Sequence, residues 1–288
     1  MRIVGYGGET YIYVSGLIVS DAIPLGEKIT LLPAALPDNR EFYNATKSNL
    51  DLGMFLMYEN LIHSQLHIIE KDPKELARIS CFAVWDLFII SALFNCEAAA
   101  TFQCNVPAER LTCNSDINAT NYHMYGLHYP LHTLTQDESK YLQDNIEAAR
   151  VLMEHHEFMT AIHCLASYRW HNGQNVQLAV IWTGIESLFN IESEISFRLS
   201  FCIAKFLEPN DVDKAKSLFD LLRKLYRARS IVVHGSFSSS SRTQIHPLNE
   251  SVVILQRILK RCIEIGELPN MNDIIFSNWE SLSEEERR

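Results

Sequence analysis

The pattern of apolar and polar positions predicts helices over most of the chain from residue 136 onward. Apolar residues recur there at intervals of three and four, which is the period of an amphipathic helix. Helices are predicted over 137–155, 158–170, 174–191, from Ser193 or Ser196 to 207, 211–234 and 247–265. We therefore expect the second half of the chain to be almost entirely helical.

The first part of the chain carries a different pattern. Residues 10–20 and 29–32 are rich in β-branched and aromatic residues and are bounded by glycines and prolines, which is typical of strands. Two long apolar helices are predicted next, over 49–69 and from 73 to about 99, and the second is apolar on nearly all sides, as a buried helix is. The expected fold class is mainly α, with an α+β region of a few short strands before a helical domain.

The least regular stretch, residues 101–135, separates these two patterns. It suggests an N-terminal α+β region over 1–136, a helical domain over 137–268 and an acidic tail over 269–288. No internal repeat is visible along the chain.

Composition places the chain among globular proteins, with 288 residues of which 47% are hydrophobic and 21% charged. The most apolar stretch, 81–94, is short and carries Asp86, so we expect a core helix and not a membrane span. The first residues lack the long apolar core of a signal peptide. Seven irregularly spaced cysteines suit a reducing compartment. These features predict a cytoplasmic protein.

Charge is distributed unevenly along the chain. The formal net charge is −10, which argues against a general nucleic-acid coat. Between residues 221 and 262, however, eight Lys or Arg accompany a single acid, Glu250, so this zone carries +7 and the remainder −17. A local basic zone can hold phosphates although the whole protein is acidic. The solvated faces of two helices would give the same count.

Cysteines and histidines gather in the irregular stretch. They are Cys104, Cys113, His123, His128 and His132. Compact zinc sites use ligand pairs two to four residues apart, whereas these residues are spread out. A loop with satisfied polar side chains is the better interpretation, and we predict no metal and no cofactor. A zinc-dependent enzyme built on this stretch is the less favoured alternative.

Two charged residues occupy helix positions that should be buried. At about 100° per residue, Arg229 shares a stripe with the apolar residues Leu218, Leu222, Leu225 and Val232. Glu186 shares a stripe of the helix 174–191 with Leu178, Trp182 and Phe189. An unpaired buried charge costs several kcal/mol, so we predict that Glu186 and Arg229 approach each other. Such a pair can fix helix packing alone or belong to a site.

His234 stands near the end of the same helix, directly before Gly235, which ends it. It lies about 140° around the helix from Arg229, so the two side chains do not meet as neighbours on adjacent turns. They could line one cleft only at the helix edge, or together with the same pair from a second subunit. A histidine in this position is commonly a C-terminal cap, but an imidazole also suits proton transfer at neutral pH.

The stretch RARSIVVHG, residues 227–235, resembles the R-x4-H motif of the HEPN superfamily of helical ribonucleases. A polar residue commonly follows the arginine there, as Ser230 does here. Together with IWTGIESLF, residues 181–189, the sequence resembles the ApeA-like branch in particular. The resemblance covers about residues 174–265.

The resemblance implies an up-down helical bundle that dimerises, so that two motifs face each other across a cleft. It implies RNA cleavage without metal, by attack of the 2′-hydroxyl on the adjacent phosphate. An imidazole can move protons to or from the reacting oxygens, and a guanidinium can bind the phosphate and stabilise its developing charge. Carried over, the candidate catalytic residues are Arg229, His234, Ser230 and Glu186. The basic zone gives Arg223, Lys224 and Arg227 as the candidate RNA-binding residues.

Members of this branch are linked to anti-phage abortive infection, in which cutting cellular RNA halts growth. The resemblance thus implies three partners: RNA, a second copy of the chain, and a phage or host protein as trigger. It implies no membrane partner. Residues 1–136 would act as a sensor or a restraint. The alternative is a non-catalytic HEPN-like module that binds a nucleotide or a partner and uses Arg229 and Glu186 only for packing.

Overall fold

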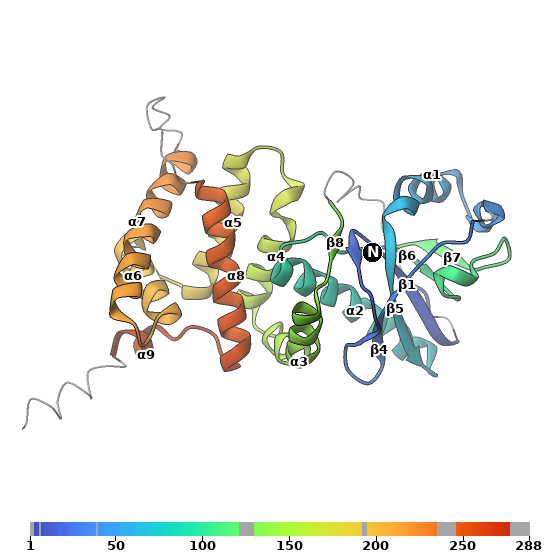
Figure 1. The fold of residues 1–288 in the computed structure, drawn as a ribbon, viewed down its shortest axis with the longest axis horizontal. Helices are drawn as coiled ribbons and strands as arrows, with labels where there is room; N and C mark the ends of the chain where they lie inside the picture. Colours follow the sequence, from blue (N-terminus) through green and yellow to red (C-terminus); the bar gives the residue numbers. More distant parts are fainter. Residues whose placement is uncertain are drawn as a thin grey trace, which may run out of the picture. The chain divides into compact units, whose positions relative to one another are not determined.

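The chain folds into two compact units, Met1–Arg150 and Val151–Arg288 (Figure 1). A computed structural model describes residues 3–5, 7–38, 40–120, 130–191, 195–234 and 246–276. The division differs from the boundary predicted at 136/137, because the helix Gln136–Leu152 (α3) is tied to the first unit by Arg150. The fold class is mainly α with an α+β region, as predicted.

The first unit is built on a six-stranded sheet with the order β3-β4-β5-β1-β6-β7. Neighbouring strands in it are antiparallel. The strands are β1 (Gly8–Ser15), β3 (Ile23–Pro24), β4 (Ile29–Pro33), β5 (Ile62–Glu70), β6 (Ala99–Cys104) and β7 (Ile117–Ala119). Two further strands, β2 (Leu17–Ile18) and β8 (His132–Thr133), pair in parallel. The sheet is therefore larger than the few short strands predicted.

Strand β1 lies between β5 and β6, and both of its faces are covered. Successive side chains of a strand point to opposite faces, so Tyr13 enters one apolar cluster with Phe55 and Phe102, whereas Ile12 is buried on the opposite face. The helix Pro73–Phe94 (α2) packs against β1, β5 and β6. This sheet thus has an apolar core on each side.

The helix predicted over 49–69 is wrong beyond Tyr58. Helix α1 covers only Asn49–Tyr58, and after a short 3-10 turn the chain becomes strand β5 at the centre of the sheet. The apolar residues of β5 fit a helical period and a strand period equally. Pairing with β1 on one side and β4 on the other makes this segment a strand. Ile62, Leu66 and Ile68 are buried as one face of this strand.

Helix α2 begins where predicted but ends earlier. The Asp72 side chain accepts a hydrogen bond from the backbone N–H of Glu75 at 2.8 Å, and Asn95 in the left-handed conformation follows the last turn. The expected burial on all sides is wrong, because Phe82 and Trp85 are 57% and 36% exposed. By length and composition α2 could cross a membrane, and 67% of its most apolar window lies buried inside the protein.

A buried ion pair joins α2 to α3. Arg150 donates two hydrogen bonds to the carboxylate of Asp86, from Nε at 2.9 Å and from a terminal nitrogen at 2.6 Å. Asp86 is almost completely buried, and this burial raises the pKa of its carboxyl despite the guanidinium beside it. The pair holds the second half of α2 and the last turn of α3 together, because a buried carboxylate needs a partner.

The second unit is helical throughout its described residues (Figure 1). Its helices are α4 (His156–Ser167), α5 (Gln174–Phe189), α6 (Ile195–Leu207), α7 (Val212–His234), α8 (Pro247–Ile265) and α9 (Met271–Phe276), with a 3-10 turn at Tyr168–Trp170. The predicted helices of this half are present with ends that shift by a few residues, and α9 was not predicted. Ser193, Gly235 and the end of the tail lie outside the described residues.

Close packing fixes α5 against α4 and α8. A Cβ atom at Gly184 would lie 3.0 Å from side-chain atoms of both Cys164 and Leu255, so glycine lets the three helices approach closely. Trp182 is buried and its indole Nε1 donates to the Ser251 hydroxyl at 3.0 Å. Both contacts set the position of α5, the helix that carries Glu186.

Removal of Arg150 should destabilise the first unit strongly. Arg150→Met would leave the Asp86 carboxylate buried without its partner, which costs roughly 3–5 kcal/mol of unfolding free energy. We expect the double variant Asp86→Leu/Arg150→Leu to recover most of this loss, because an apolar pair of similar size needs no desolvation. Urea denaturation gives the unfolding free energy of each variant.

The matched control is Lys140→Met on the same helix, where the partner Asp144 is exposed. It should change the unfolding free energy by no more than about 0.5 kcal/mol. Equal losses in the Lys140 and Arg150 variants would contradict the role assigned to the buried pair.

Candidate functional site

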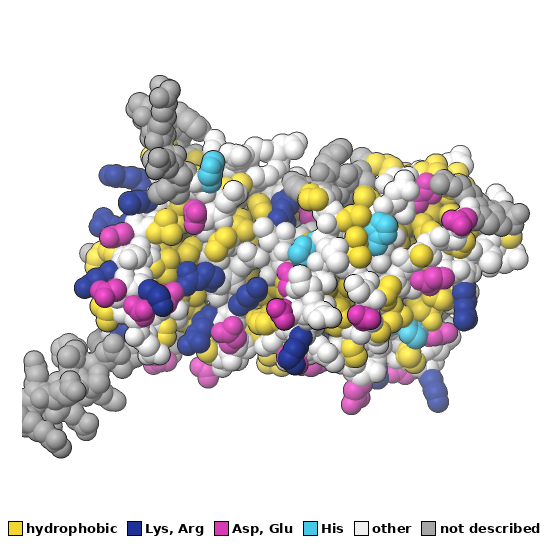
Figure 2. All heavy atoms as spheres, viewed as in Figure 1, with side chains coloured by type: hydrophobic (Ala, Val, Ile, Leu, Met, Phe, Trp, Pro, Cys, Tyr) yellow, Lys and Arg dark blue, Asp and Glu magenta, His cyan; other side chains and the backbone are white. Residues whose placement is uncertain are grey.

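Helix α7 carries most of the candidate site. Asp211 directly precedes its first residue, Val212, and the Asp211 side chain accepts a hydrogen bond from the backbone N–H of Lys214 at 2.9 Å. Its apolar stripe of Leu218, Leu222 and Leu225 is buried, and the helix packs against α5, α6 and α8. The stripe fixes the rotation of α7, so Arg223, Lys224 and Arg227 face outward. Figure 2 shows Lys and Arg side chains gathered over α7 and α8 on the visible face.

The ion pair between Arg229 and Glu186 is present, which confirms that prediction. A terminal nitrogen of Arg229 donates to Oε2 of Glu186 at 3.0 Å, and the two side chains are 19% and 28% exposed. Within the described ranges, Oε1 of Glu186 and Nε of Arg229 are shielded from solvent and form no hydrogen bond. The pair is therefore held by one hydrogen bond and retains further donor and acceptor capacity.

Burial dominates the electrostatics of this pair. It raises the pKa of the Glu186 carboxyl, and the charge and hydrogen bond of Arg229 only partly offset the effect. Burial and the nearby Glu186 also raise the pKa of Tyr226. A carboxylate that stays charged in such surroundings depends on its guanidinium partner.

Tyr226 connects this pair to the outer face of α7. The Arg229 guanidinium lies 5.7 Å from the centroid of the Tyr226 ring. The same ring packs edge-on against Trp182 of α5 at 5.3 Å. Tyr226 lies three residues before Arg229, a spacing that indicates a shared helix face.

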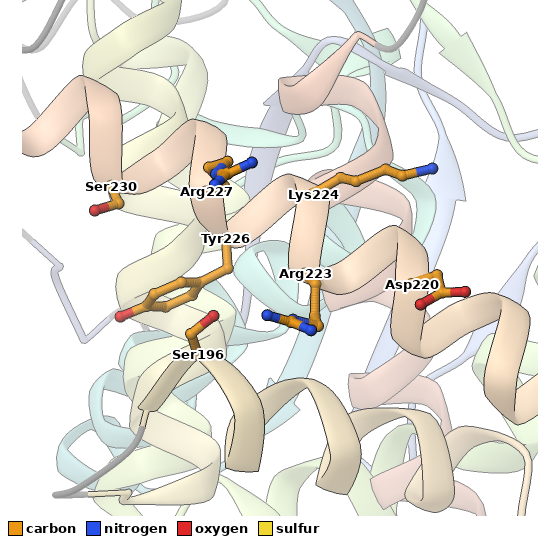
Figure 3. A pocket seen from close by; sticks show the side chains of 7 residues that line it. All are labelled: Ser196, Asp220, Arg223, Lys224, Tyr226, Arg227 and Ser230. Atoms are coloured by element: carbon orange, nitrogen blue, oxygen red, sulfur yellow. The ribbon is translucent and has the colours of Figure 1, made fainter.

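A basic pocket opens on the outer side of Tyr226. It has a volume of about 560 Å³ and is lined by Ser196, Asp220, Arg223, Lys224, Tyr226, Arg227 and Ser230. We call it the α7 pocket. Arg223 and Tyr226 extend toward Ser196 of α6, whereas Lys224 points away from them (Figure 3). Three cations and one acid line this pocket, which favours an anionic ligand.

The structure thus divides the candidate residues into two groups, one that lines the α7 pocket and one that lies behind it. Arg223, Lys224, Arg227 and Ser230 line the α7 pocket. Arg229 and Glu186 form the ion pair behind it, and Tyr226 contacts Arg229 and lines the pocket. His234 is the last residue of α7, and its side chain lies outside the described part of the chain.

The stretch 101–135 is more regular than predicted. It contains the end of β6 and all of β7, and these two strands pair with each other in the sheet. Cys104 is buried there, and burial raises the pKa of its thiol. His132 lies 3.3 Å from Glu138. Among the described residues no three His, Cys, Asp or Glu side chains are placed to hold a metal ion, and His123 and His128 lie outside them.

Comparison with known proteins identifies no relative. No protein-family model matches the chain, and neither a curated protein nor a solved structure matches it.

Loss of Arg229 should destabilise the protein in a pH-dependent way. The folded-state pKa of Glu186 lies above its ordinary value of 4.5, so its stabilising contribution is present below that value and is lost as pH rises through the folded-state pKa. Arg229→Met removes the partner that lowers this pKa. We expect a loss of about 1–2 kcal/mol at pH 8 and a clearly smaller loss at pH 5, measured by urea denaturation.

The double variant Glu186→Gln/Arg229→Met serves as the control, because it has no carboxylate left to titrate at this place. The pH dependence that Glu186 gives to the unfolding free energy should be absent from this variant. If Arg229→Met loses the same unfolding free energy at pH 5 and at pH 8, the ion pair with Glu186 is not the cause of that loss.

Proposed function

We propose that the second unit is a metal-independent endoribonuclease of the HEPN type, which cuts RNA by attack of a 2′-hydroxyl on the adjacent phosphate. The observation that carries the proposal is the arrangement of α7. Arg223, Arg227 and Ser230 line one basic pocket, and Tyr226 joins that pocket to the Arg229–Glu186 pair. Arg229 and Ser230 of the motif therefore lie on the same stretch of α7 as the candidate RNA-binding residues.

The proposed roles follow from the chemistry of the side chains. Arg223, Lys224 and Arg227 hold the RNA backbone, since cationic side chains bind phosphates wherever they cluster. Arg229 stabilises the charge that develops on the attacked phosphate. A guanidinium has several N–H donors, so Arg229 can keep its bond to Glu186 while it binds a phosphate oxygen. Glu186 orients the guanidinium and does not itself react.

His234 is the proposed proton-transfer group, and the proposed site is completed by a second copy of the chain. The helical period separates Arg229 and His234 by about 140°, so one helix does not present both to the same phosphate as direct neighbours. In a homodimer the pair of one chain can face the pair of the other. Growth arrest in response to a phage or host trigger, with the first unit as sensor or restraint, is the proposed context.

A second candidate function is a non-catalytic module that binds a nucleotide or a partner. The observation that favours it is the position of the Arg229–Glu186 pair, which is largely buried between α5 and α7 beside Trp182. In that case the pair stabilises helix packing, and the α7 pocket binds an anionic group without cutting it.

Cleavage in the presence of EDTA tests the proposal. Wild-type protein should cut total RNA and a short single-stranded RNA, and it should leave DNA of the same sequence intact, because DNA has no 2′-hydroxyl. His234→Ala should reduce the rate at least about 100-fold, the size of a general acid–base contribution. The rate of each variant is read from gel-resolved fragments.

The matched control is His171→Ala, which removes an exposed histidine of the same unit and should cut at the wild-type rate. Equal cutting by the wild type and His234→Ala would indicate a contaminating nuclease and overturn the assignment of His234. Binding of RNA by a wild-type protein that cuts nothing would favour the non-catalytic module.

A further inference from the structure

An apolar groove runs between α6 and the first half of α7. It has a volume of about 420 Å³ and includes Phe197, Phe201 and Val212 in its lining, together with Phe219. Phe197 is 55% exposed and Phe201 is 38% exposed. Large apolar side chains gathered in an exposed groove mark a binding surface, because their exposure to water is unfavourable.

The aromatic rings of this groove are arranged as a platform. Phe197 and Phe201 lie one turn apart on α6 with their ring planes within 6° and their centroids 6.4 Å apart. Phe219 of α7 meets the Phe197 ring edge-on at 5.5 Å. Phe219 therefore supports Phe197 from the side of α7.

The groove lies beside the α7 pocket. Ser196 of the pocket precedes Phe197 of the groove, and Asp220 of the pocket follows Phe219 of the groove. The Arg223 guanidinium lies 5.8 Å from the centroid of the Phe219 ring. Groove and pocket together form one surface between the two helices, which we call the α6–α7 seam.

Cations also line the apolar part of the seam. Lys205 and Lys216 contribute to the groove, and its acidic residue, Glu208, forms an ion pair with Arg257 of α8. The groove itself is therefore positive, and it lies beside a pocket that is also positive. A purely apolar partner would gain nothing from these charges, so the seam fits a ligand that combines anionic groups with flat apolar ones.

Unpaired RNA has this combination, since its phosphates are anionic and its bases expose flat faces that stack on aromatic side chains. A duplex buries the same faces in its own base stack. We propose that the α6–α7 seam binds single-stranded RNA, with bases on Phe197 and Phe201 and phosphates on Arg223 and Arg227. The inference rests on the proposed function and restricts its substrate to unpaired segments.

The test compares two double variants of the full chain. Phe197→Leu/Phe201→Leu keeps apolar bulk but removes the aromatic faces, whereas Phe197→Tyr/Phe201→Tyr keeps them. The probe is a fluorescent twelve-nucleotide RNA with 2′-O-methyl groups throughout, which blocks 2′-hydroxyl attack, used alone or annealed to its complement. Anisotropy at one fixed salt concentration gives each Kd, since RNA affinity depends strongly on salt.

We expect the wild type to prefer the single strand. The Leu pair should weaken single-strand binding about tenfold or more, the size of one lost stacking contact, and should leave duplex binding within about twofold. The Tyr pair should bind like the wild type. Arg223→Gln/Arg227→Gln should weaken single-strand and duplex binding alike, because phosphates are common to both.

Three results would overturn the inference: no RNA binding by the wild type, equal affinity for single strand and duplex, or wild-type affinity in the Leu pair. If the Leu pair binds RNA normally but changes the molecular mass measured by light scattering, a second copy covers the groove instead. The proposed nuclease is judged separately. If the Leu pair binds RNA with unchanged affinity and still cuts it, the seam proposal fails and the nuclease proposal holds. If binding depends on the two phenylalanines but the wild type cuts no RNA, the seam proposal holds and the nuclease proposal fails.

Discussion

The burial of one apolar stripe of α7 determines the arrangement of the whole candidate site. Leu218, Leu222 and Leu225 must face the neighbouring helices, and this requirement fixes the rotation of the helix about its axis. Arg229 falls on the same stripe and enters the packed region, where Glu186 of α5 neutralises it. The opposite face then presents Arg223 and Arg227 to solvent. One constraint thus produces both the ion pair and the basic pocket.

Helix α5, which carries Glu186, is itself held in place by close packing against α4 and α8. Gly184 allows close approach to α4 and α8, and Trp182 is anchored to Ser251 by its indole nitrogen. Glu186 follows Trp182 by one helical turn, so its carboxylate is placed by the same contacts. Because Trp182 also packs against Tyr226, the wall of the α7 pocket is supported by the core of the unit.

The first unit is stabilised by a separate core of its own. Its sheet is covered on both faces, and Asp86 with Arg150 ties α3 to α2. Such a unit has the elements of an independently folded domain. This independence is compatible with the proposed role as a sensor or restraint. The basic zone of an otherwise acidic protein lies in the second unit, where the proposed RNA-binding residues are.

The sequence by itself determined the helices of the second half and the Glu186–Arg229 pair, because a helix period of about 3.6 residues fixes which side chains share a face. It also placed Arg223, Lys224 and Arg227 together, since they lie within two turns of one helix. Only the tertiary structure decided that residues 62–70 form a strand, because this apolar run fits both periods and its partners β1 and β4 come from distant parts of the chain. The α6–α7 seam was not predicted from the sequence either. Phe197 and Phe201 look like core residues, and only the packing of α6 against α7 leaves their rings exposed beside Arg223.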